Sequence, residues 1–162
     1  MRSNRLQLNP AKTEILWFSS SRRQFQIPQV PFCVGTATIT PSSIVRDLGI
    51  YLDSNLSMTA HIFKTVSNCF SAMRLIRSVR RSVSRAVLLS LVTSLVLSRV
   101  DYGNATLAGL PARQLCRLQS VLHAAARIVF SARKYDHVTP LLRELHWLRV
   151  PERIIFKLAY HQ

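Results

Sequence analysis

Five arginines lie close together in the middle of the sequence, and their spacing suits the binding of phosphate groups. Arg74, Arg77 and Arg81 recur every three or four residues, so a helix would carry them on one face, and Arg80 and Arg85 lie beside them. An arginine presents a planar fork of donors that matches phosphate oxygens. The alternative is a solvated helix end, where cations suit the helix dipole. With the charge of the whole chain, the row predicts a nucleic-acid-binding face.

The chain as a whole is strongly basic. Its 162 residues include 22 Lys and Arg against 7 Asp and Glu, a net charge of +15. Such an excess indicates a polyanionic partner, most often a nucleic acid and less often an anionic membrane. A second basic set, Arg113, Arg117 and Arg127, is more simply the polar side of an amphipathic helix. The longest apolar run, over residues 86–97, is shorter than the roughly 20 residues of a membrane span, so no membrane partner is predicted.

The acidic residues are too scattered to hold a pair of catalytic metal ions. Asp47 and Asp53 are six residues apart, which on one extended strand places them on the same face but about 20 Å from each other. Asp101 and Asp136 fall in other predicted elements. A two-metal site needs carboxylates that reach both ions. No metal site is therefore predicted, and the five histidines lack any local hydrolase signature beside a nucleophile.

Three widely spaced cysteines, Cys33, Cys69 and Cys116, show neither zinc-ligand spacing nor an even number for pairing. They predict thiols that act as small core hydrophobes in an intracellular, reducing compartment, with nothing to distinguish nucleus from cytoplasm. The residues after Met1 are polar and basic, so a signal peptide is not expected.

The first third of the chain has the character of strands. Residues 14–18, 32–40 and 45–52 are short apolar or β-branched stretches, and prolines lie in the connections between them. They predict a short antiparallel meander within residues 1–56. Trp17 and Trp147 lie within apolar runs and are predicted to anchor cores.

From residue 57 onward the apolar residues recur with helical periodicity. Helices are predicted over 57–80, 84–100, from 111, over 139–147 and from 150 onward. Ser57 or Thr59 is the expected cap of the first. The second is apolar nearly all round and is expected to be central. The predicted fold class is therefore α+β, with a strand unit (1–56) before a helical bundle (57–162). The apolar face of the last helix continues up to Gln162 without a terminating residue, which predicts that the chain is a piece of a longer protein.

Several motifs resemble, in order and spacing, the downstream part of non-LTR (LINE-type) retrotransposon reverse transcriptases. They are LNPAKTE at 8–14, VRDLGIYLD at 45–53, VDYGN at 100–104 with LP at 110–111, LQ to AR at 118–127, and HVTP, LHWL and the Pro, Arg and Lys that come after them over 137–157. The resemblance covers nearly all of the chain. It implies that the strands are a remnant of the polymerase palm and that the helices are its thumb and helical extension.

The resemblance also implies roles for two residues of the strand unit. Lys12 falls where such enzymes have a lysine near the incoming nucleotide, as a candidate acid for the pyrophosphate leaving group. The alternative is a surface lysine beside Glu14. Gly49 falls in the strand that supports the primer end, where a missing side chain lets a nucleic-acid backbone approach. The alternative is an ordinary β-bulge glycine.

In these polymerases an Asp-Asp box that holds Mg²⁺ precedes the LNPAKTE-like segment, and no Asp-Asp pair occurs in this sequence. The chain is therefore expected to hold no cofactor, to be inactive alone, and to act with a missing upstream polymerase portion. The predicted function is that of a reverse transcriptase (RNA-directed DNA polymerase) fragment that binds an RNA template and a DNA primer. The alternatives are a basic helical scaffold that binds RNA or DNA, and a non-functional remnant of a decayed transposable element.

Overall fold

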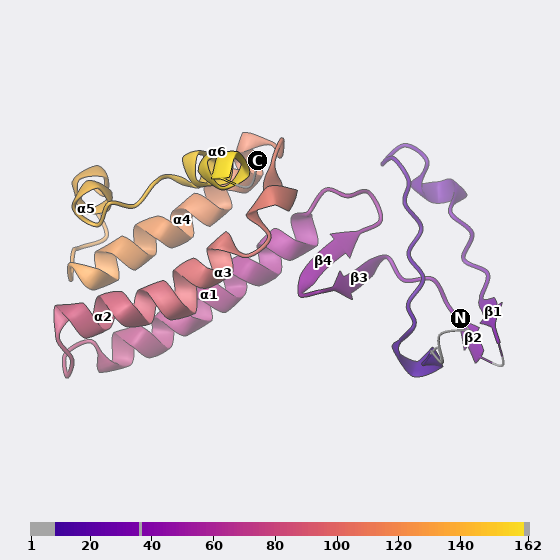
Figure 1. Cartoon of the computed structure of the whole chain (residues 1–162), viewed down its shortest axis with the longest axis horizontal. Coiled ribbons are helices and arrows are strands. Elements are labelled where there is room, and N and C mark those ends of the chain that lie inside the picture. The colour runs from indigo at the N-terminus through magenta and orange to yellow at the C-terminus, as the bar shows by residue number, and fades with distance from the viewer. Residues whose placement is uncertain (1–8, 36, 161–162) are drawn as a thin grey trace. The chain divides into compact units, whose positions relative to one another are not determined.

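The computed structural model describes residues 9–35 and 37–160, and it is an α+β structure with antiparallel strand pairs followed by helices (Figure 1). The predicted fold class is confirmed. Contacts divide the chain into two compact units, Met1–His61 and Ile62–Gln162. The sequence predicted a division between residues 56 and 57.

The strand unit contains two separate hairpins. β1 (Phe32–Val34) pairs antiparallel with β2 (Ala37–Ile39), and β3 (Ile44–Asp47) pairs antiparallel with β4 (Ile50–Asp53). The predicted stretches 32–40 and 45–52 thus each fold back on themselves rather than running straight. In the second hairpin, Leu48 and Gly49 both have positive φ, 44° and 86°, as a two-residue turn of type I′ requires.

The β3–β4 turn changes the relation between Asp47 and Asp53. Asp47 lies opposite Ile50, so Asp53 is three positions farther along the hairpin, roughly 10 Å away. Because side chains alternate between the faces of a sheet, this odd offset places the two carboxylates on opposite faces. The expectation of one face and about 20 Å was wrong because the chain reverses between them.

The expected strand over residues 14–18 does not form. Leu16 makes only an isolated bridge with Ser42, and the amide of Ser42 donates to the carbonyl of Ile15 at 2.8 Å. Trp17 remains exposed beside the ring of Phe32, so it is not the predicted core anchor. Short 3₁₀ turns, η2 (Pro10–Lys12) and η3 (Gln24–Gln26), flank this segment. An apolar run forms a strand only where a neighbouring strand offers a continuous edge, and here one residue is paired.

The first turn of α1 (Thr59–Val79) is capped by the carboxylate of Asp53. Its two oxygens accept hydrogen bonds from the amides of Met58 and Thr59, both at 3.0 Å, and from the Ser57 hydroxyl at 2.7 Å. Of the caps expected from the sequence, Ser57 or Thr59, the hydroxyl of Ser57 also accepts from the amide of Thr59, at 3.3 Å. Burial by itself raises the pKa of Asp53, but the hydrogen bonds from Ser57 and the first-turn amides outweigh it, so the pKa lies below its ordinary value.

Replacing Asp53 with alanine should lower the free energy of unfolding by about 1 kcal/mol at pH 7, because it removes this cap. A carboxyl whose pKa is lowered by folding stabilises the protein above its unfolded pKa, about 3.9, and loses that contribution as the pH falls through the folded pKa. Urea unfolding of the wild type and of Asp53→Ala should therefore converge toward acid pH. Asp47→Ala, which changes an exposed carboxylate of the same hairpin, is the control. An equal loss in both variants at pH 7 would contradict the capping role.

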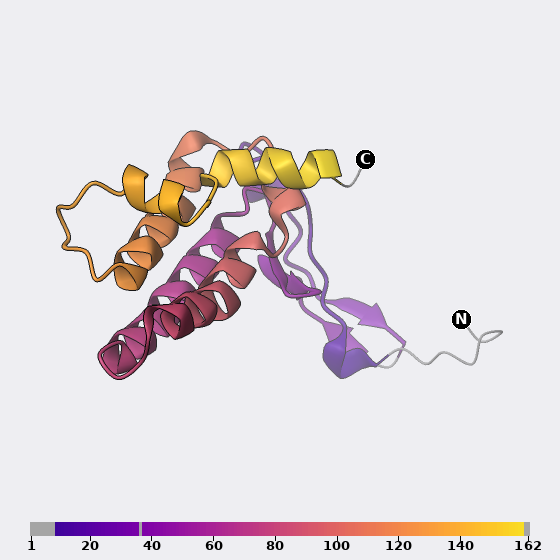
Figure 2. The same ribbon diagram turned by 60° about the vertical axis from the view of Figure 1, so that its left-hand side comes forward.

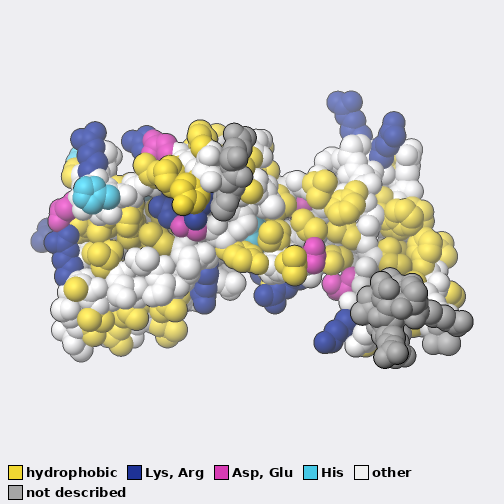
Figure 3. All heavy atoms as spheres, in the orientation of Figure 1, with side chains coloured by type: hydrophobic (Ala, Val, Ile, Leu, Met, Phe, Trp, Pro, Cys, Tyr) yellow, Lys and Arg dark blue, Asp and Glu magenta, His cyan; other side chains and the backbone are white. Residues whose placement is uncertain are grey.

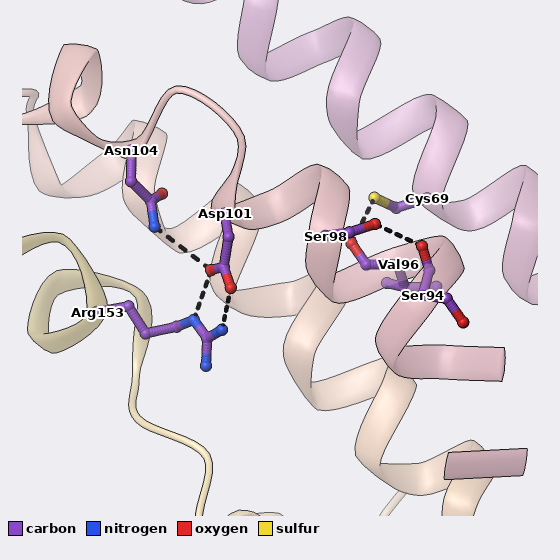
Figure 4. Close-up of polar contacts among 7 residues, drawn as sticks. All are labelled: Cys69, Ser94, Val96, Ser98, Asp101, Asn104 and Arg153. Carbon is purple, nitrogen blue, oxygen red and sulfur yellow. Dashed lines mark hydrogen bonds and ion pairs between the residues drawn. The ribbon is translucent and has the colours of Figure 1, made fainter. Parts of the chain in front are cut away.

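In the helical unit a long rod runs antiparallel beside α1 (Figures 1 and 2). It consists of α2 (Arg85–Val92), the π-helical segment η4 (Thr93–Leu97) and α3 (Ser98–Asp101). Ser84 caps it, as the predicted start at residue 84 requires, by accepting a hydrogen bond from the amide of Val87. The hydroxyl of Ser94, in η4, donates to the carbonyl of Ser90, and the hydroxyl of Ser98, at the start of α3, donates to the carbonyl of Ser94 (Figure 4 shows the second bond). Such bonds compete with regular helix geometry.

The remaining helices complete the core of this unit. They are η5 (Asn104–Leu107), α4 (Ala112–Val129), α5 (Thr139–Glu144) and α6 (Val150–Tyr160). The apolar face of α4 is buried from Leu118 onward. α5 ends three residues before the predicted Trp147. In the part of the chain that the structure describes, no helix is long and apolar enough to cross a membrane.

The burial of two helices in this unit differs from a simple amphipathic pattern. On α1 the buried side chains include Cys69, Met73 and Ile76, whereas Phe63 and Phe70 are exposed. The rod is not buried all round, because Val87 and Leu95 face outward. A periodic apolar pattern identifies a helix but leaves its rotation undetermined when large apolar residues occur on more than one side.

Only one of the three cysteines is a core hydrophobe. Cys69 is buried and its thiol donates to the carbonyl of Val96 at 3.8 Å (Figure 4), whereas Cys33 and Cys116 are exposed. The expectation of three core thiols was therefore wrong for two of them.

Candidate nucleic-acid interface

The helical unit contains a hollow of about 800 Å³ that is lined by five cationic side chains. These five, with the small and apolar residues between them, define what we call the basic hollow. Its cations are Arg77, Arg80, Arg81, Arg127 and Lys134. No aspartate or glutamate belongs to its described lining. Figure 3 shows dark-blue Lys and Arg side chains at the left-hand end of this unit, beside α4 and α5.

The direction of two helices explains why these cations meet. α1 and α4 run the same way, so their carboxyl ends lie at the same end of the unit (Figures 1 and 2). Arg77 is in the last turn of α1, and Arg127 is in the last turn of α4. Helix carboxyl ends carry partial negative charge, which favours cations there. After α4 the amide of Ala132 donates to the carbonyl of Arg127 at 2.9 Å, and this turn begins the loop that carries Lys134 to the hollow.

The predicted row of arginines is interrupted at Val79, where α1 ends. Arg80 and Arg81 lie in the turn beyond it, and the amide of Ser82 donates to the carbonyl of Val79 at 2.9 Å to close that turn. The three arginines Arg77, Arg80 and Arg81 still line one hollow. The row of Arg74, Arg77 and Arg81 on one helical face, as expected from the sequence, is therefore partly replaced by a turn.

The charge of the basic hollow is not neutralised from within the described residues. The described residues form two ion pairs, Arg85–Glu144 at 2.6 Å and Arg153–Asp101. Both pairs lie outside the lining of the hollow. The guanidinium of Arg127 donates through Nη2 to the carbonyl of Asp136 at 3.2 Å. Its Nε is buried with no hydrogen-bond acceptor among the described residues. A buried donor without an acceptor is unusual and fits a site that receives one from a ligand.

Two of the predicted arginines lie outside the basic hollow. Arg74 is exposed and donates to the hydroxyl of Ser71 at 3.2 Å. Arg85 is held by Glu144, and its guanidinium lies 4.0 Å from the centre of the Phe130 ring. These contacts give Arg85 a structural role.

Of the weaker set, Arg127 lines the basic hollow and Arg113 and Arg117 do not. All three occupy α4, and only the last is at its carboxyl end.

The two site residues implied by the resemblance both lie in the strand unit. Lys12 ends the short turn η2 and is exposed, with its amide donating to the carbonyl of Asn9 at 3.1 Å. Gly49 occupies the second position of the β3–β4 turn, and its φ of 86° is a sufficient reason for glycine there. Their proposed roles toward nucleotide and primer stay predictions.

The Mg²⁺ ions that the resemblance implies for a whole polymerase do not fit the acidic residues that the structure describes. Asp47 and Asp53 face opposite ways, Asp101 pairs with Arg153, and Asp136 accepts from the amide of Arg133 at 2.5 Å. No three His, Cys, Asp or Glu side chains within residues 9–35 and 37–160 gather as a metal site. No step of the proposed function therefore passes through a metal.

A second cavity of about 550 Å³, which we call the side pocket, adjoins the basic hollow at Arg127, a residue that lines both. Its apolar walls come from α4, α5 and the start of α6, and its polar groups include His123, Tyr135 and Asp136. Sequence reasoning missed these residues and Lys134. Only Arg127 carried a signal, as a cation on the polar face of an amphipathic helix.

The hydrogen bonds of the side pocket determine the protonation of His123. The Oε1 of Gln119 accepts from the amide of Val150 at 2.8 Å, so the Nε2 of Gln119 must donate to the Nε2 of His123, 2.9 Å away. Neutral His123 therefore carries its proton on Nδ1. Burial, with smaller contributions from Arg127 and Arg149, lowers the pKa of His123 below its ordinary value.

Comparisons of this chain with protein-family models, with curated proteins and with solved structures found no match.

Proposed function

We propose that the helical unit binds the sugar-phosphate backbone of a nucleic acid in the basic hollow. The observation that carries this proposal is the convergence of Arg77, Arg80, Arg81, Arg127 and Lys134 around one concavity whose described lining contains no carboxylate. Phosphate oxygens complement such a surface, and release of the counterions around them drives the association. The net charge of +15 supports the same partner.

The resemblance to non-LTR retrotransposon reverse transcriptases gives this binding a proposed context. In that context the bundle is the thumb and helical extension of an RNA-directed DNA polymerase, and its partners are the RNA template, the DNA primer and the upstream polymerase portion. The compartment would be intracellular and reducing. The binding itself needs nothing from the strand unit, because all five cations lie in Ile62–Gln162. The same site would therefore also serve a nucleic-acid-binding scaffold.

Removing charge from the basic hollow should weaken binding more than removing the same charge elsewhere. The test variant changes Arg77, Arg81 and Lys134 to glutamine, and the matched control changes Arg113, Arg117 and Arg143. All six side chains are exposed, so neither set is expected to disturb folding. With an RNA–DNA duplex at about 0.15 M salt, we expect the test variant to bind roughly tenfold more weakly, and its salt slope to fall by about 2 to 3.

The control should change both quantities much less. Fluorescence anisotropy across salt concentrations measures them. If the two triple variants had the same slope, the basic hollow would not be the binding site.

The coding DNA upstream of Met1 distinguishes the polymerase context from the scaffold. An in-frame segment that encodes an aromatic residue, any residue and two aspartates would support a polymerase, whereas stop codons there would favour a remnant. A cooperative thermal transition of the purified chain would argue against a decayed, non-folding product.

A further inference from the structure

We propose that the side pocket receives one unpaired nucleobase of the strand whose phosphates lie in the basic hollow. The inference rests on the proposed function and refines it, because it names the substrate class as a nucleic acid with an unpaired nucleotide rather than continuous duplex.

The two cavities share a wall, which is the first support for the inference. Arg127 lines both, and its buried Nε has no acceptor among the described residues. Its Nη2 donates to the carbonyl of Asp136, in the loop segment between α4 and α5 that also carries Tyr135. A strand that runs through the basic hollow would therefore pass Arg127, the residue at which the side pocket adjoins the hollow.

The linings of the two cavities suit different parts of a nucleotide. The basic hollow has five cations and no described carboxylate, which suits phosphate. The side pocket includes Leu115, Val138, Leu142 and Pro151, and it also includes the acidic Asp136. The side pocket also includes Arg127 and Arg149, so its charges are mixed, and its apolar walls favour a flat, neutral group. The volume of about 550 Å³ lies within the range of about 300–1,000 Å³ that is typical of ligand pockets.

An aromatic ring stands at the side pocket. Tyr135 lines the pocket, yet 89% of this residue is exposed to solvent. The ammonium of the neighbouring Lys134 lies 5.8 Å from the centre of the ring, and Lys134 itself lines the basic hollow. Exposed aromatic rings beside cations are the usual stacking platforms for unpaired bases. Tyr135 and Lys134 thus place a stacking surface next to a phosphate-binding one.

The polar groups inside the side pocket suit the edge of a base. His123 is neutral with its proton on Nδ1, because Gln119 donates to its Nε2. A neutral, orientation-fixed donor in an apolar pocket can bond a ring nitrogen or carbonyl without the desolvation cost of a charge.

The test compares three fluorescent probes of the same sequence. They are a continuous RNA–DNA duplex, the same duplex with one unpaired nucleotide, and one of its strands alone. The full chain should bind the duplex with the unpaired nucleotide about tenfold more tightly than the continuous duplex. Tyr135→Ala should remove this preference and leave the affinity for continuous duplex unchanged, whereas Tyr135→Phe, which keeps the ring, should retain it. Because Tyr135 is so exposed, neither substitution is expected to disturb folding.

A spectroscopic measurement identifies the pocket directly. 2-Aminopurine at the unpaired position should lose fluorescence on binding the wild type and much less on binding Tyr135→Ala. Equal affinity for the continuous and interrupted duplexes would overturn the inference and leave the proposed function standing. A preference that survives Tyr135→Ala would also overturn it, since the base would lie elsewhere. If the wild type bound none of the three probes, the proposed function itself would fail.

Discussion

Replacing Arg153 with methionine should lower the free energy of unfolding of the helical unit by about 3 kcal/mol. The guanidinium of Arg153, on α6, donates through Nε to Asp101 Oδ1 at 2.8 Å and through Nη2 to Oδ2, at the end of α3 (Figure 4). The two side chains are only 17% and 22% exposed. Removing the arginine would leave a largely buried carboxylate whose remaining side-chain partner among the described residues is the amide of Asn104, at 3.3 Å.

The exposed pair Arg85–Glu144 is the matched control for this prediction. Its side chains are 55% and 58% exposed, so Glu144→Gln should cost less than about 1 kcal/mol. Changing the glutamate rather than the arginine keeps the contact of Arg85 with Phe130. Urea unfolding followed by far-ultraviolet circular dichroism measures both losses. The double variant Asp101→Asn/Arg153→Met should recover part of the stability, because it also removes the stranded charge. Equal losses for the buried and exposed pairs would contradict the argument.

The helices could be predicted from the sequence, and the strands only in part, for physical reasons. Helical periodicity is local, so the first helix was expected at 57–80 and α1 is found at Thr59–Val79. A strand is completed by residues elsewhere in the chain. Residues 14–18 have a strand-like composition but meet a single bridging residue, Ser42. At 45–52 the pair Leu48 and Gly49 reverses the chain, and the turn signal of the glycine was overlooked inside an apolar run.

The candidate site could be predicted only as far as it is local in sequence. Arg77, Arg80 and Arg81 lie within five residues, and their spacing made them candidates. Arg127 and Lys134 join them because α1 and α4 end side by side, which no periodicity of either helix reveals. Arg85 was included for its sequence position, although a partner 59 residues away holds it. Proximity in sequence therefore wrongly includes Arg85 in the site and misses Lys134, which the fold brings to it.

Cys69 should react with a thiol reagent far more slowly than Cys33 and Cys116. Burial raises the pKa of the Cys69 thiol from about 9 to about 11, with a smaller opposing effect of Arg99. The thiolate is the nucleophile, and raising its pKa lowers the fraction present at pH 8 to about 0.1%, roughly a hundredfold below that of a thiol with a pKa of 9. Burial against α3 and η4 excludes the reagent as well. In the native protein two thiols should therefore react rapidly with Ellman's reagent, and in the unfolded protein all three should do so.

The slow reaction of Cys69 also reports the stability that Arg153 supplies. If Cys69 reacts only when the helical unit opens, its rate follows the population of the open state. A loss of about 3 kcal/mol in Arg153→Met then corresponds to labelling about 150 times faster, while Glu144→Gln should change the rate less than about fivefold. Cys33→Ser/Cys116→Ser protein leaves Cys69 as the reporting thiol. Rapid labelling of Cys69 in this protein without denaturant would show that α1 and the rod separate readily, and the buried packing of Cys69 against Val96 would then be wrong.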